Sequence, residues 1–439
     1  MLILLAACSD DATVSLGGDG PTWHADVAPV VAARCGSCHT AGGIAPFAFD
    51  TWEEAAALAP AMAAATASGS MPPWGAVETD ECAPRYGWKD DARLTDDEKA
   101  LFAAWADAGA PEGDPAEASE VEPARGELAD ADAELVPATP YVTSGKDDEF
   151  VCFSLDPGLT ERAWVTGVEV VPDDLSVVHH VVVYSDPNGE SAALAGEDGL
   201  YDCFGDADVS DAMVLGVWVP GAFPTSPPEG SGFPVEAGSR VVLQMHYHPA
   251  GSAGAPDATG VRLAWTSERP EKTALLTGWG NAWDEGSGLL PGPNDRDAAE
   301  FRIPADVAGH TETMTFDFGD VGGRYAVWAM EAHMHMVGVD MLATVEHRDP
   351  DVGVAEECLI HEPAWDFDWQ RLYTYDAPLG EVSLGDDDVL TLRCTYDNTL
   401  ANPGVARALD DAGLDEPEDV YLGESSYDEM CILIFGIVY

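Results

Sequence analysis

The residues best suited to chemistry are histidines that recur in close groups after residue 140. Three segments carry two each: His179 with His180, His246 with His248, and His333 with His335. Two histidines separated by one residue point to the same side of a β-strand, so both imidazoles can bind one metal ion. Adjacent histidines point to opposite sides of a regular strand and reach one ion only at a twist, a bulge or a strand end. Because imidazole suits both copper and zinc, these groups predict one or two copper or zinc sites.

A methionine near the end of the sequence extends the set of possible ligands. Met430 lies in Asp428-Glu429-Met430-Cys431, and its thioether favours Cu(I) and is a poor zinc ligand. The sequence has no His-Glu-x-x-His motif, the pattern that presents two zinc ligands on one helical face. A zinc hydrolase is therefore the weakest of the metal hypotheses.

The segment Cys35-Gly36-Ser37-Cys38-His39 has the C-x-x-C-H pattern by which c-type haem is attached. The two thiols bond to the haem vinyl groups, and the adjacent histidine becomes an axial ligand of the iron. A thioredoxin-like redox pair or a chance match is the alternative, but such a pair is typical of a βαβ context and this motif ends a helical stretch. We therefore predict haem on Cys35, Cys38 and His39.

Met71 is the best candidate for the sixth iron ligand. It opens Met71-Pro72-Pro73-Trp74, where the prolines favour an extended loop that can present a thioether. Met62 lies in an alanine-rich helical stretch and is interpreted as a core residue. His24 is interpreted as a helix-cap surface residue, with packing near the haem as the alternative. In length, helix order and both ligand motifs, residues 21–112 resemble a small class I cytochrome c domain.

The elements expected in this domain are helices. The sequence predicts Asp26–Arg34, Thr51–Ala65, and a helix that a capping box at Thr95 and Glu98 opens and that runs to about Ala108. Pro60 should kink or split the second of them. Residues 113–140 combine proline, alanine and acids and indicate a solvated linker.

Beyond residue 140, short β-branched runs alternate with Gly, Pro, Asp and Asn, which is typical of a β-sandwich or barrel. The expected strands are Ala163–Val171, Val177–Tyr184, Arg240–His246, Gly260–Trp265, Met314–Phe318, Tyr325–Met330, Met341–Val345, Val389–Cys394 and Met430–Val438. This region is long for one sandwich, so we predict two, at 141–285 and 286–439.

The net charge narrows the range of partners. Eighty Asp and Glu face nineteen Lys and Arg, which gives −61. No basic stripe exists to replace phosphate counterions, which excludes a nucleic-acid binder, and the same charge opposes docking on anionic lipid. A solvated surface is favoured over an acidic docking face for a basic partner.

The first residues, Met1-Leu-Ile-Leu-Leu-Ala-Ala-Cys8, look like the end of a bacterial lipoprotein signal in which Cys8 is lipidated. The basic n-region of such signals is missing, so the alternatives are a gene start placed too late or a chance match. We expect an exported chain, periplasmic or on the outer membrane or cell surface of a bacterium, with residues 9–20 as a tether. In an exported protein most of the remaining cysteines should be paired: Cys82, Cys152, Cys203, Cys358, Cys394 and Cys431.

Four segments resemble, in the same order, the metal-binding strands of the copper type II, ascorbate-dependent monooxygenases, the peptidylglycine and dopamine β-monooxygenase family. They are Val177–Tyr184, Val242–Tyr247, Ala332–His335 and Ser425–Cys431. The resemblance spans residues 147–439 and implies two jelly-roll-like β-sandwiches, each with one copper, facing each other across a solvent-filled cleft. It implies two ligand sets: His179, His180 and His246 for an electron-transfer copper, and His333, His335 and Met430 for the copper where dioxygen is activated.

The same resemblance implies two disulfides, Cys394–Cys431 and Cys152–Cys203. Cys82 and Cys358 are left over, and they either bridge the haem domain to the copper region or are separately paired or free. His248 is expected beside the ligands rather than among them. Three further histidines match nothing in the family and are expected at the surface or in packing: His310, His347 and His361.

The sequence departs from the family at the substrate site. Peptide-hydroxylating members have an arginine two residues before the His-x-His, which holds a substrate carboxylate, and this chain has Glu331. Ile432 and Ile434 occupy the other carboxylate-binding positions, so a glycine-extended peptide is an unsuitable substrate. Glu331 either pairs with a cationic amine or is a surface acid. The aromatic segment Trp365–Gln370 either lines the cleft or packs within a strand.

The sequence as a whole predicts a monooxygenase that hydroxylates a C–H bond of a small molecule, with two coppers and one c-type haem. Dioxygen is the co-substrate, and electrons come through the fused haem, from ascorbate, or from a redox donor protein. The alternative is a non-enzymatic surface electron carrier whose β-sandwiches bind copper or a partner. Substrate-dependent oxygen uptake separates the two hypotheses.

Overall fold

The computed structural model describes residues 20–41, 43, 45–119, 127–145, 149–203, 205–247, 256–423, 425 and 427–439. The predictions for Cys8 and His248, and for the tether before residue 20, lie outside these residues. The chain forms two compact units, each described by itself. The helical unit is the chain up to Trp74 with residues 92–125, and the β-rich unit is residues 75–91 with 126–439.

The helical unit contains η1 (Trp23–Val27), α1 (Ala28–Arg34), α2 (Trp52–Ser68), α3 (Asp96–Asp107) and η2 (Pro115–Glu117). Its core includes Val27, Phe102 and Trp105. The predicted capping box is confirmed, because Thr95 Oγ1 accepts from the N–H of Glu98 and the Glu98 carboxylate accepts from the N–H of Thr95. Pro60, expected to kink or split α2, does not split the helix, which continues through it, and a kink there stays a prediction. Met62 is buried in this core as predicted.

The β-rich unit contains twenty strands among its described residues. The first part has β1 (Ala133–Leu135), β2 (Glu149–Leu155), β3 (Ala163–Val171), β4 (Val178–Asp186), α4 (Ser191–Leu194), β5 (Leu200–Asp202), β6 (Met213–Trp218), β7 (Ser231–Val235), β8 (Arg240–Tyr247), β9 (Gly260–Thr266), β10 (Lys272–Gly280) and η3 (Glu285–Ser287). The second part has β11 (Arg302–Ile303), β12 (Ala308–Asp317), β13 (Arg324–His333), β14 (Gly338–Glu346), η4 (Pro350–Val352), β15 (Glu356–Glu362), η5 (Phe367–Trp369), β16 (Tyr373–Thr374), β17 (Ser383–Gly385), β18 (Val389–Asp397), α5 (Pro403–Ala412), β19 (Val420–Tyr421) and β20 (Ile432–Val438). Each of the nine predicted strands overlaps one of these.

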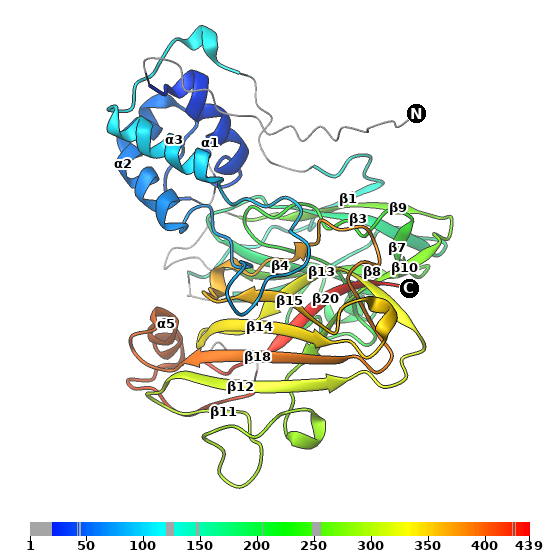
Figure 1. Cartoon of the computed structure of the whole chain (residues 1–439). Coiled ribbons are helices and arrows are strands. Elements are labelled where there is room, and N and C mark those ends of the chain that lie inside the picture. The colour runs from blue at the N-terminus through cyan, green and yellow to red at the C-terminus, as the bar shows by residue number, and fades with distance from the viewer. Residues whose placement is uncertain are drawn as a thin grey trace, which may run out of the picture. The chain divides into compact units, whose positions relative to one another are not determined.

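Four sheets build this unit (Figure 1). A five-stranded sheet, β5-β2-β8-β4-β6, packs through a common core on a nine-stranded sheet, β1-β9-β3-β7-β10-β20-β13-β16, in which β17 also pairs with β13. A four-stranded sheet, β12-β18-β14-β15, and the pair β11-β19 complete the second part. The mostly β architecture is consistent with the predicted sandwiches.

The nine-stranded sheet is shared by both parts of the β-rich unit. Antiparallel pairing of β10 with β20, from Ala274 opposite Val438 to Gly280 opposite Ile432, joins strands from before and after residue 285. Because one sheet takes strands from both sides of residue 285, the division into sandwiches at 141–285 and 286–439 stays a prediction. The predicted linker is shorter than 113–140, because β1 pairs with β9 and the N–H of Asp132 donates to the carbonyl of Leu263.

Residues 75–91, predicted to be part of the cytochrome-like domain, belong instead to the β-rich unit. Cys82 forms a disulfide with Cys358 of β15. The Trp88 ring stacks on Tyr375 at a centroid distance of 4.7 Å. The pairing of Cys82 with Cys358 is thus confirmed, but both cysteines lie within the β-rich unit. The other two predicted disulfides, Cys152–Cys203 and Cys394–Cys431, are also present.

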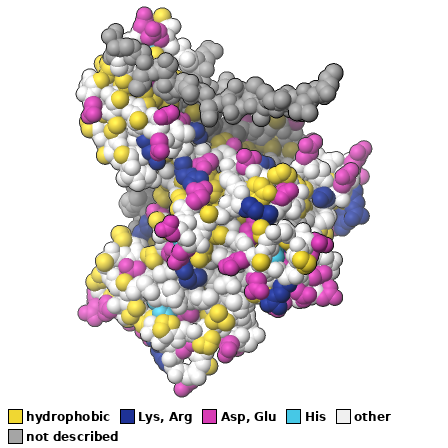
Figure 2. Space-filling view, viewed as in Figure 1, with side chains coloured by type: hydrophobic (Ala, Val, Ile, Leu, Met, Phe, Trp, Pro, Cys, Tyr) yellow, Lys and Arg dark blue, Asp and Glu magenta, His cyan; other side chains and the backbone are white. Residues whose placement is uncertain are grey.

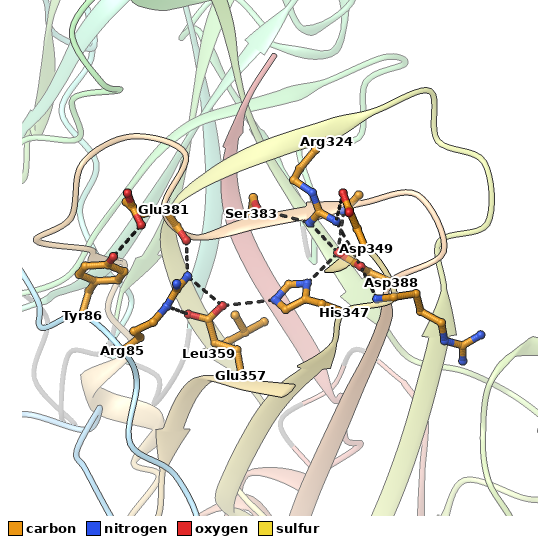
Figure 3. Close-up of polar contacts among 12 residues, drawn as sticks. Arg85, Tyr86, Arg324, His347, Asp349, Glu357, Leu359, Glu381, Ser383 and Asp388 are labelled. Carbon is orange, nitrogen blue, oxygen red and sulfur yellow. Dashed lines mark hydrogen bonds and ion pairs between the residues drawn. The ribbon is translucent and has the colours of Figure 1, made fainter. Parts of the chain in front are cut away.

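A charged network fixes the middle of residues 75–91 (Figure 3). Arg85 Nε donates to Glu357 Oε1 at 3.0 Å, and the Glu357 carboxylate also contacts His347 Nε2 at 3.3 Å. His347 Nδ1 lies 3.0 Å from Asp388 Oδ2, which also accepts from Arg324 Nη1 at 2.8 Å. Burial alone would lower the pKa of His347, but the two carboxylates outweigh it and raise that pKa. The sequence-based expectation for His347 is therefore corrected from a surface or packing residue to a buried ionic one.

His347→Gln should destabilise the protein more at low pH than at high pH. A histidine whose pKa is raised on folding stabilises the native state fully below its unfolded pKa of about 6.5, and that stabilisation is lost as pH rises through the native pKa. The cost should be about 2 kcal/mol at pH 5.5 and smaller at pH 8.5, measured from urea unfolding with the disulfides intact. Arg85→Gln is the control, because arginine keeps its charge over this range. Equal costs for His347→Gln at both pH values would contradict the assignment.

The surface of the chain matches its charge. Figure 2 shows acidic side chains scattered over the visible face, with fewer lysines and arginines among them. This distribution is typical of a solvated surface. Among the described residues, no helix is both long and apolar enough to span a membrane.

Candidate metal centres

The first metal-binding candidate is a triangle of histidine nitrogens in the five-stranded sheet. The Nδ1 atoms of His179, His180 and His246 lie 3.1, 3.2 and 3.3 Å from one another. His180 lies opposite His246 in the pairing of β4 with β8, and the register shifts between Val178 and His180. That irregularity turns the adjacent histidines toward one point, as the sequence analysis required of a His-His pair.

The size of this triangle fits one small metal ion. A metal–nitrogen distance of about 2.0–2.1 Å with angles near 105° places ligand nitrogens roughly 3.2 Å apart. These three histidines are also the described residues that form a potential metal-binding group of His, Cys, Asp or Glu side chains. Three imidazoles without a thiolate suit copper or zinc.

Surrounding side chains hold the rings of this cluster in place. Phe150 stacks on His246 with the centroids 4.3 Å apart and the planes 7° from parallel. Asp368 Oδ1 lies 3.1 Å from Nε2 of His179. This ring nitrogen carries the proton and donates it to the carboxylate, which leaves Nδ1 as the metal-binding atom.

Asp368 is itself held as an anion. Arg407 of α5 donates to both of its oxygens, at 3.0 and 3.1 Å. Burial would raise the pKa of Asp368, but the hydrogen bonds from His179 and Arg407 outweigh it and keep the pKa well below its usual range. A carboxylate that stays charged raises the basicity of the histidine it accepts from, which favours metal binding.

The second candidate lies where β13 ends. His333 is the last residue of β13 and His335 follows it outside the strand, so the expected His-x-His on one strand is corrected to a strand end. The two rings are 5.3 Å apart and 87° from parallel. Each has an acceptor at Nδ1: Gln370 Oε1 at 2.6 Å from His333 and the Asp428 carbonyl at 3.1 Å from His335. Both rings therefore keep Nε2 for a metal.

These two imidazoles are neutral at ordinary pH. Burial lowers the pKa of His333, and burial with the neighbouring His333 lowers the pKa of His335 to about 3. Neutral imidazole is the form that binds metals.

Met430, the predicted third ligand of this site, is tied to His335 by Glu429. The buried Glu429 carboxylate accepts N–H groups through both oxygens, from His335 and Met430 on Oε2 and from Val337 and Gly338 on Oε1, at 2.7–3.1 Å. The next residue, Cys431, is disulfide-bonded to Cys394 of β18. The Tyr396 hydroxyl donates to the Met430 carbonyl at 2.9 Å. The backbone around Met430 is thus fixed beside that of His335, while its role as a ligand stays a prediction.

Three residues that position the ligands were missed by the sequence analysis: Asp368, Gln370 and Glu429. The first two lie in the aromatic segment Trp365–Gln370, which forms a short 3₁₀ turn rather than a strand. Its unusual composition was the available signal. Glu429 is one more acid in a very acidic chain, and nothing in the sequence distinguishes it.

Glu331 is buried, so the expectation of a surface acid is wrong. It is 2% exposed, as is Glu362, and burial raises the pKa of each to about 8. Among the described residues, Glu331 Oε2 and Glu362 Oε1 have no hydrogen-bond partner. The pairing of Glu331 with a cationic amine stays a prediction.

In the helical unit, Gly36 and His39 of the C-x-x-C-H motif border a cavity of about 500 Å³. Trp23, Val31 and Phe49 line it together with His39 and His24, so His24 borders this cavity rather than the open surface. His39 Nδ1 lies 3.1 Å from the Phe47 carbonyl, and the ring stacks on Phe49 at 4.4 Å. A partly apolar cavity beside a histidine whose Nε2 remains for iron fits a haem.

The other predicted haem residues are Cys35, Cys38 and Met71. Cys35 and Cys38 carry thiols rather than a disulfide, and burial, with Cys38 nearby, raises the pKa of Cys35 to about 12. Met71 is 38% exposed and is not among the residues that line the cavity. Its role as the sixth ligand stays a prediction.

Comparison with known proteins finds weak similarity to two monooxygenases. The chain is 31% identical over 145 residues to peptidyl-glycine alpha-amidating monooxygenase B of Xenopus laevis, which covers 32% of this chain and 15% of that protein. It is 25% identical over 303 residues to monooxygenase A of the same species, 67% of this chain and 27% of that protein. This is weak homology to copper monooxygenases. This chain spans only about a quarter or less of the length of these relatives.

Two further comparisons add nothing to the assignment. No family model matches the chain. Among solved structures, the major capsid protein P2 of bacteriophage PM2 covers 70% of this chain at 11% identity, with a TM-score of 0.27. That score carries no argument about fold or function.

Proposed function

We propose that this chain is a copper-dependent monooxygenase that hydroxylates a C–H bond of a small molecule. The observation that carries the proposal is the triangle of Nδ1 atoms from His179, His180 and His246, whose sides of 3.1–3.3 Å suit one metal ion. The weak homology to copper monooxygenases supports copper as that metal. The second ligand set would be His333, His335 and Met430.

The overall reaction consumes one dioxygen, two electrons and two protons and yields the hydroxylated product and water. Copper at the two sites would supply dioxygen activation and one-electron redox chemistry. The protein's part is to keep the ligand atoms ready. Asp368 holds the Nε2 proton of His179, and Gln370 and the Asp428 carbonyl hold the Nδ1 protons of His333 and His335. These partners set which nitrogen carries the proton and which is left for metal in three of the five imidazoles.

We also propose that the helical unit carries a covalent c-type haem on Cys35, Cys38 and His39, and that it delivers electrons to the β-rich unit alongside or in place of ascorbate. The cavity beside His39 supports this. The chain crosses between the two units at residues 74/75, 91/92 and 125/126, which keeps their effective mutual concentration high. The three disulfides are typical of an oxidising compartment, in line with export. Anchoring through Cys8 in a bacterial periplasm or outer membrane remains part of the proposal.

Metal content and oxygen uptake test the proposal. The full chain, made in a periplasm with haem maturation and dialysed against copper, should hold two coppers and one iron per polypeptide. A screen of small molecules, cationic amines first because of the buried Glu331, should find one that accelerates ascorbate-dependent oxygen uptake with matching product. Iron without tightly bound copper would contradict the monooxygenase and leave the alternative, a haem electron carrier on a β-sandwich scaffold.

A further inference from the structure

One short segment, Trp365–Gln370, contacts both histidine groups. Within its turn, Asp368 Oδ1 accepts from His179 Nε2 at 3.1 Å. Two residues later, Gln370 Oε1 accepts from His333 Nδ1 at 2.6 Å. A single backbone turn, η5 with its flanking residues, thus sets a ring proton in each group.

The aromatic residues of the segment extend these contacts. The Phe367 ring centroid lies 6.0 Å from that of His179, 6.3 Å from that of His246 and 6.3 Å from that of His335. Trp365 Nε1 donates to the carbonyl of His335 at 3.2 Å. Four of the five described histidines proposed as ligands therefore touch these six residues.

Hydrogen bonds within the segment link its residues to one another. The Asp366 side chain accepts from the N–H of Asp368, and the Asp366 carbonyl accepts from the N–H of Trp369, both at 3.0 Å. Arg407 of α5 clamps the Asp368 carboxylate. Gln370 Nε2 donates to the Phe367 carbonyl at 3.1 Å, which fixes the amide so that Oε1 faces His333. The Asp368 contact to His179 and the Gln370 contact to His333 are therefore connected through one short, internally hydrogen-bonded segment.

We propose that Trp365–Gln370 is a positioning element that couples the two metal sites, so that metal at one site raises the affinity of the other. This rests on the metal-binding part of the proposed function. Metal held by His179 fixes that ring, which orders Asp368 and the turn. Gln370 and Phe367 then hold His333 and His335 before their own metal arrives, so the entropy of ordering is lost once rather than twice. Linkage requires the effect to be equal in both directions.

The test is a set of copper titrations on the full chain. Cu(II) affinity of the first site is measured with the second intact and with it disabled by His335→Ala, and the reciprocal measurement disables the first by His180→Ala. In the natural chain the coupling should be about tenfold in each direction. Gln370→Ala should reduce it to near onefold, and Gln370→Glu, which retains an acceptor oxygen, should restore most of it.

A structural defect would not produce this pattern. Asp349→Ala is the matched control, because Asp349 caps the 3₁₀ helix η4 as Asp366 caps η5, and the coupling should persist in it. Gln370→Ala should also change the Cu(II) EPR spectrum of the first site, although the partner of His179 in this segment is Asp368 and that of Gln370 is His333. If Gln370→Ala does not fold, Phe367→Leu provides the same comparison.

The failures of the two proposals are distinguishable. Two coppers bound with onefold coupling, or with coupling that Gln370→Ala leaves unchanged, would overturn the coupling and leave the monooxygenase. Absence of copper at either site would overturn the proposed function itself.

Discussion

His180→Ala is expected to remove copper from the first site and leave the second occupied. The Nδ1 of His180 is one corner of a triangle whose other corners lie 3.2 and 3.3 Å away. Loss of a residue that only orients a ligand typically weakens metal binding by about 10–100-fold, so loss of a ligand should cost at least roughly 100-fold. Copper content should fall from two to one per chain, measured by elemental analysis after gel filtration.

A matched control separates a ligand effect from the loss of any buried histidine. His310 is 3% exposed and its Nε2 lies 2.7 Å from Glu312 Oε1, away from both histidine groups. His310→Gln should keep both coppers. Equal copper content in His180→Ala and the natural chain would contradict the first site, whereas loss of copper in His310→Gln would point to general destabilisation.

Glu429→Ala is expected to cause the largest loss of stability and to empty the second site. The carboxylate is 0% exposed and accepts four backbone N–H groups, which the substitution leaves buried without acceptors. One unsatisfied buried donor costs about 1–3 kcal/mol, so the total should be at least about 3 kcal/mol. The same change frees the backbone of His335 and Met430. Denaturant unfolding should show the destabilisation, and copper analysis should show one ion in place of two.

Variants at two positions make this prediction specific. Glu429→Gln keeps one acceptor oxygen and should have an intermediate effect. Glu362→Gln is the control, because Glu362 is a similarly buried acid whose Oε1 lacks a partner among the described residues. Its replacement should be nearly neutral for stability. If Glu429→Ala and Glu362→Gln proved equally stable, the four N–H bonds would not carry the stability assigned to them.

Glu429→Ala and His180→Ala should empty different metal sites. Glu429 touches the backbone of the second site, whereas His180 belongs to the first. Glu429→Ala should therefore leave copper at His179, His180 and His246, apart from the tenfold weakening that the coupling predicts. Loss of both coppers in a folded Glu429→Ala protein would indicate that the two sites are not separate binding events.

The sequence predicted features that depend on neighbours along the chain. The capping box at Thr95 and Glu98 formed as expected, because both partners lie within one helical turn. The β-branched runs became strands, β3 with the predicted bounds, because alternating apolar side chains suit a pleated sheet with one buried face. Resemblance to a family supplied two disulfides that spacing alone could not have chosen among the possible pairings.

The tertiary structure decided what depends on residues far apart. Residues 75–91 lie between two helical stretches and yet pack in the β-rich unit, because the Cys82–Cys358 disulfide and the Arg85–Glu357 ion pair join positions more than 270 residues apart. Glu331 became a buried acid because β13 runs inside the nine-stranded sheet. Local composition contains no information about either pairing.

The candidate metal sites also combine features that the sequence determined with features that only the tertiary structure decided. The residue types and spacing of His179, His180, His246, His333 and His335 determined that a metal could be bound and which atoms were available. The bulge in β4, the end of β13 and the turn that carries Asp368 and Gln370 decided which nitrogens converge and which carry protons. A ligand is recognised by its own chemistry, but its orientation is set by hydrogen-bond partners 37 or 189 residues away, and only folding brings them together.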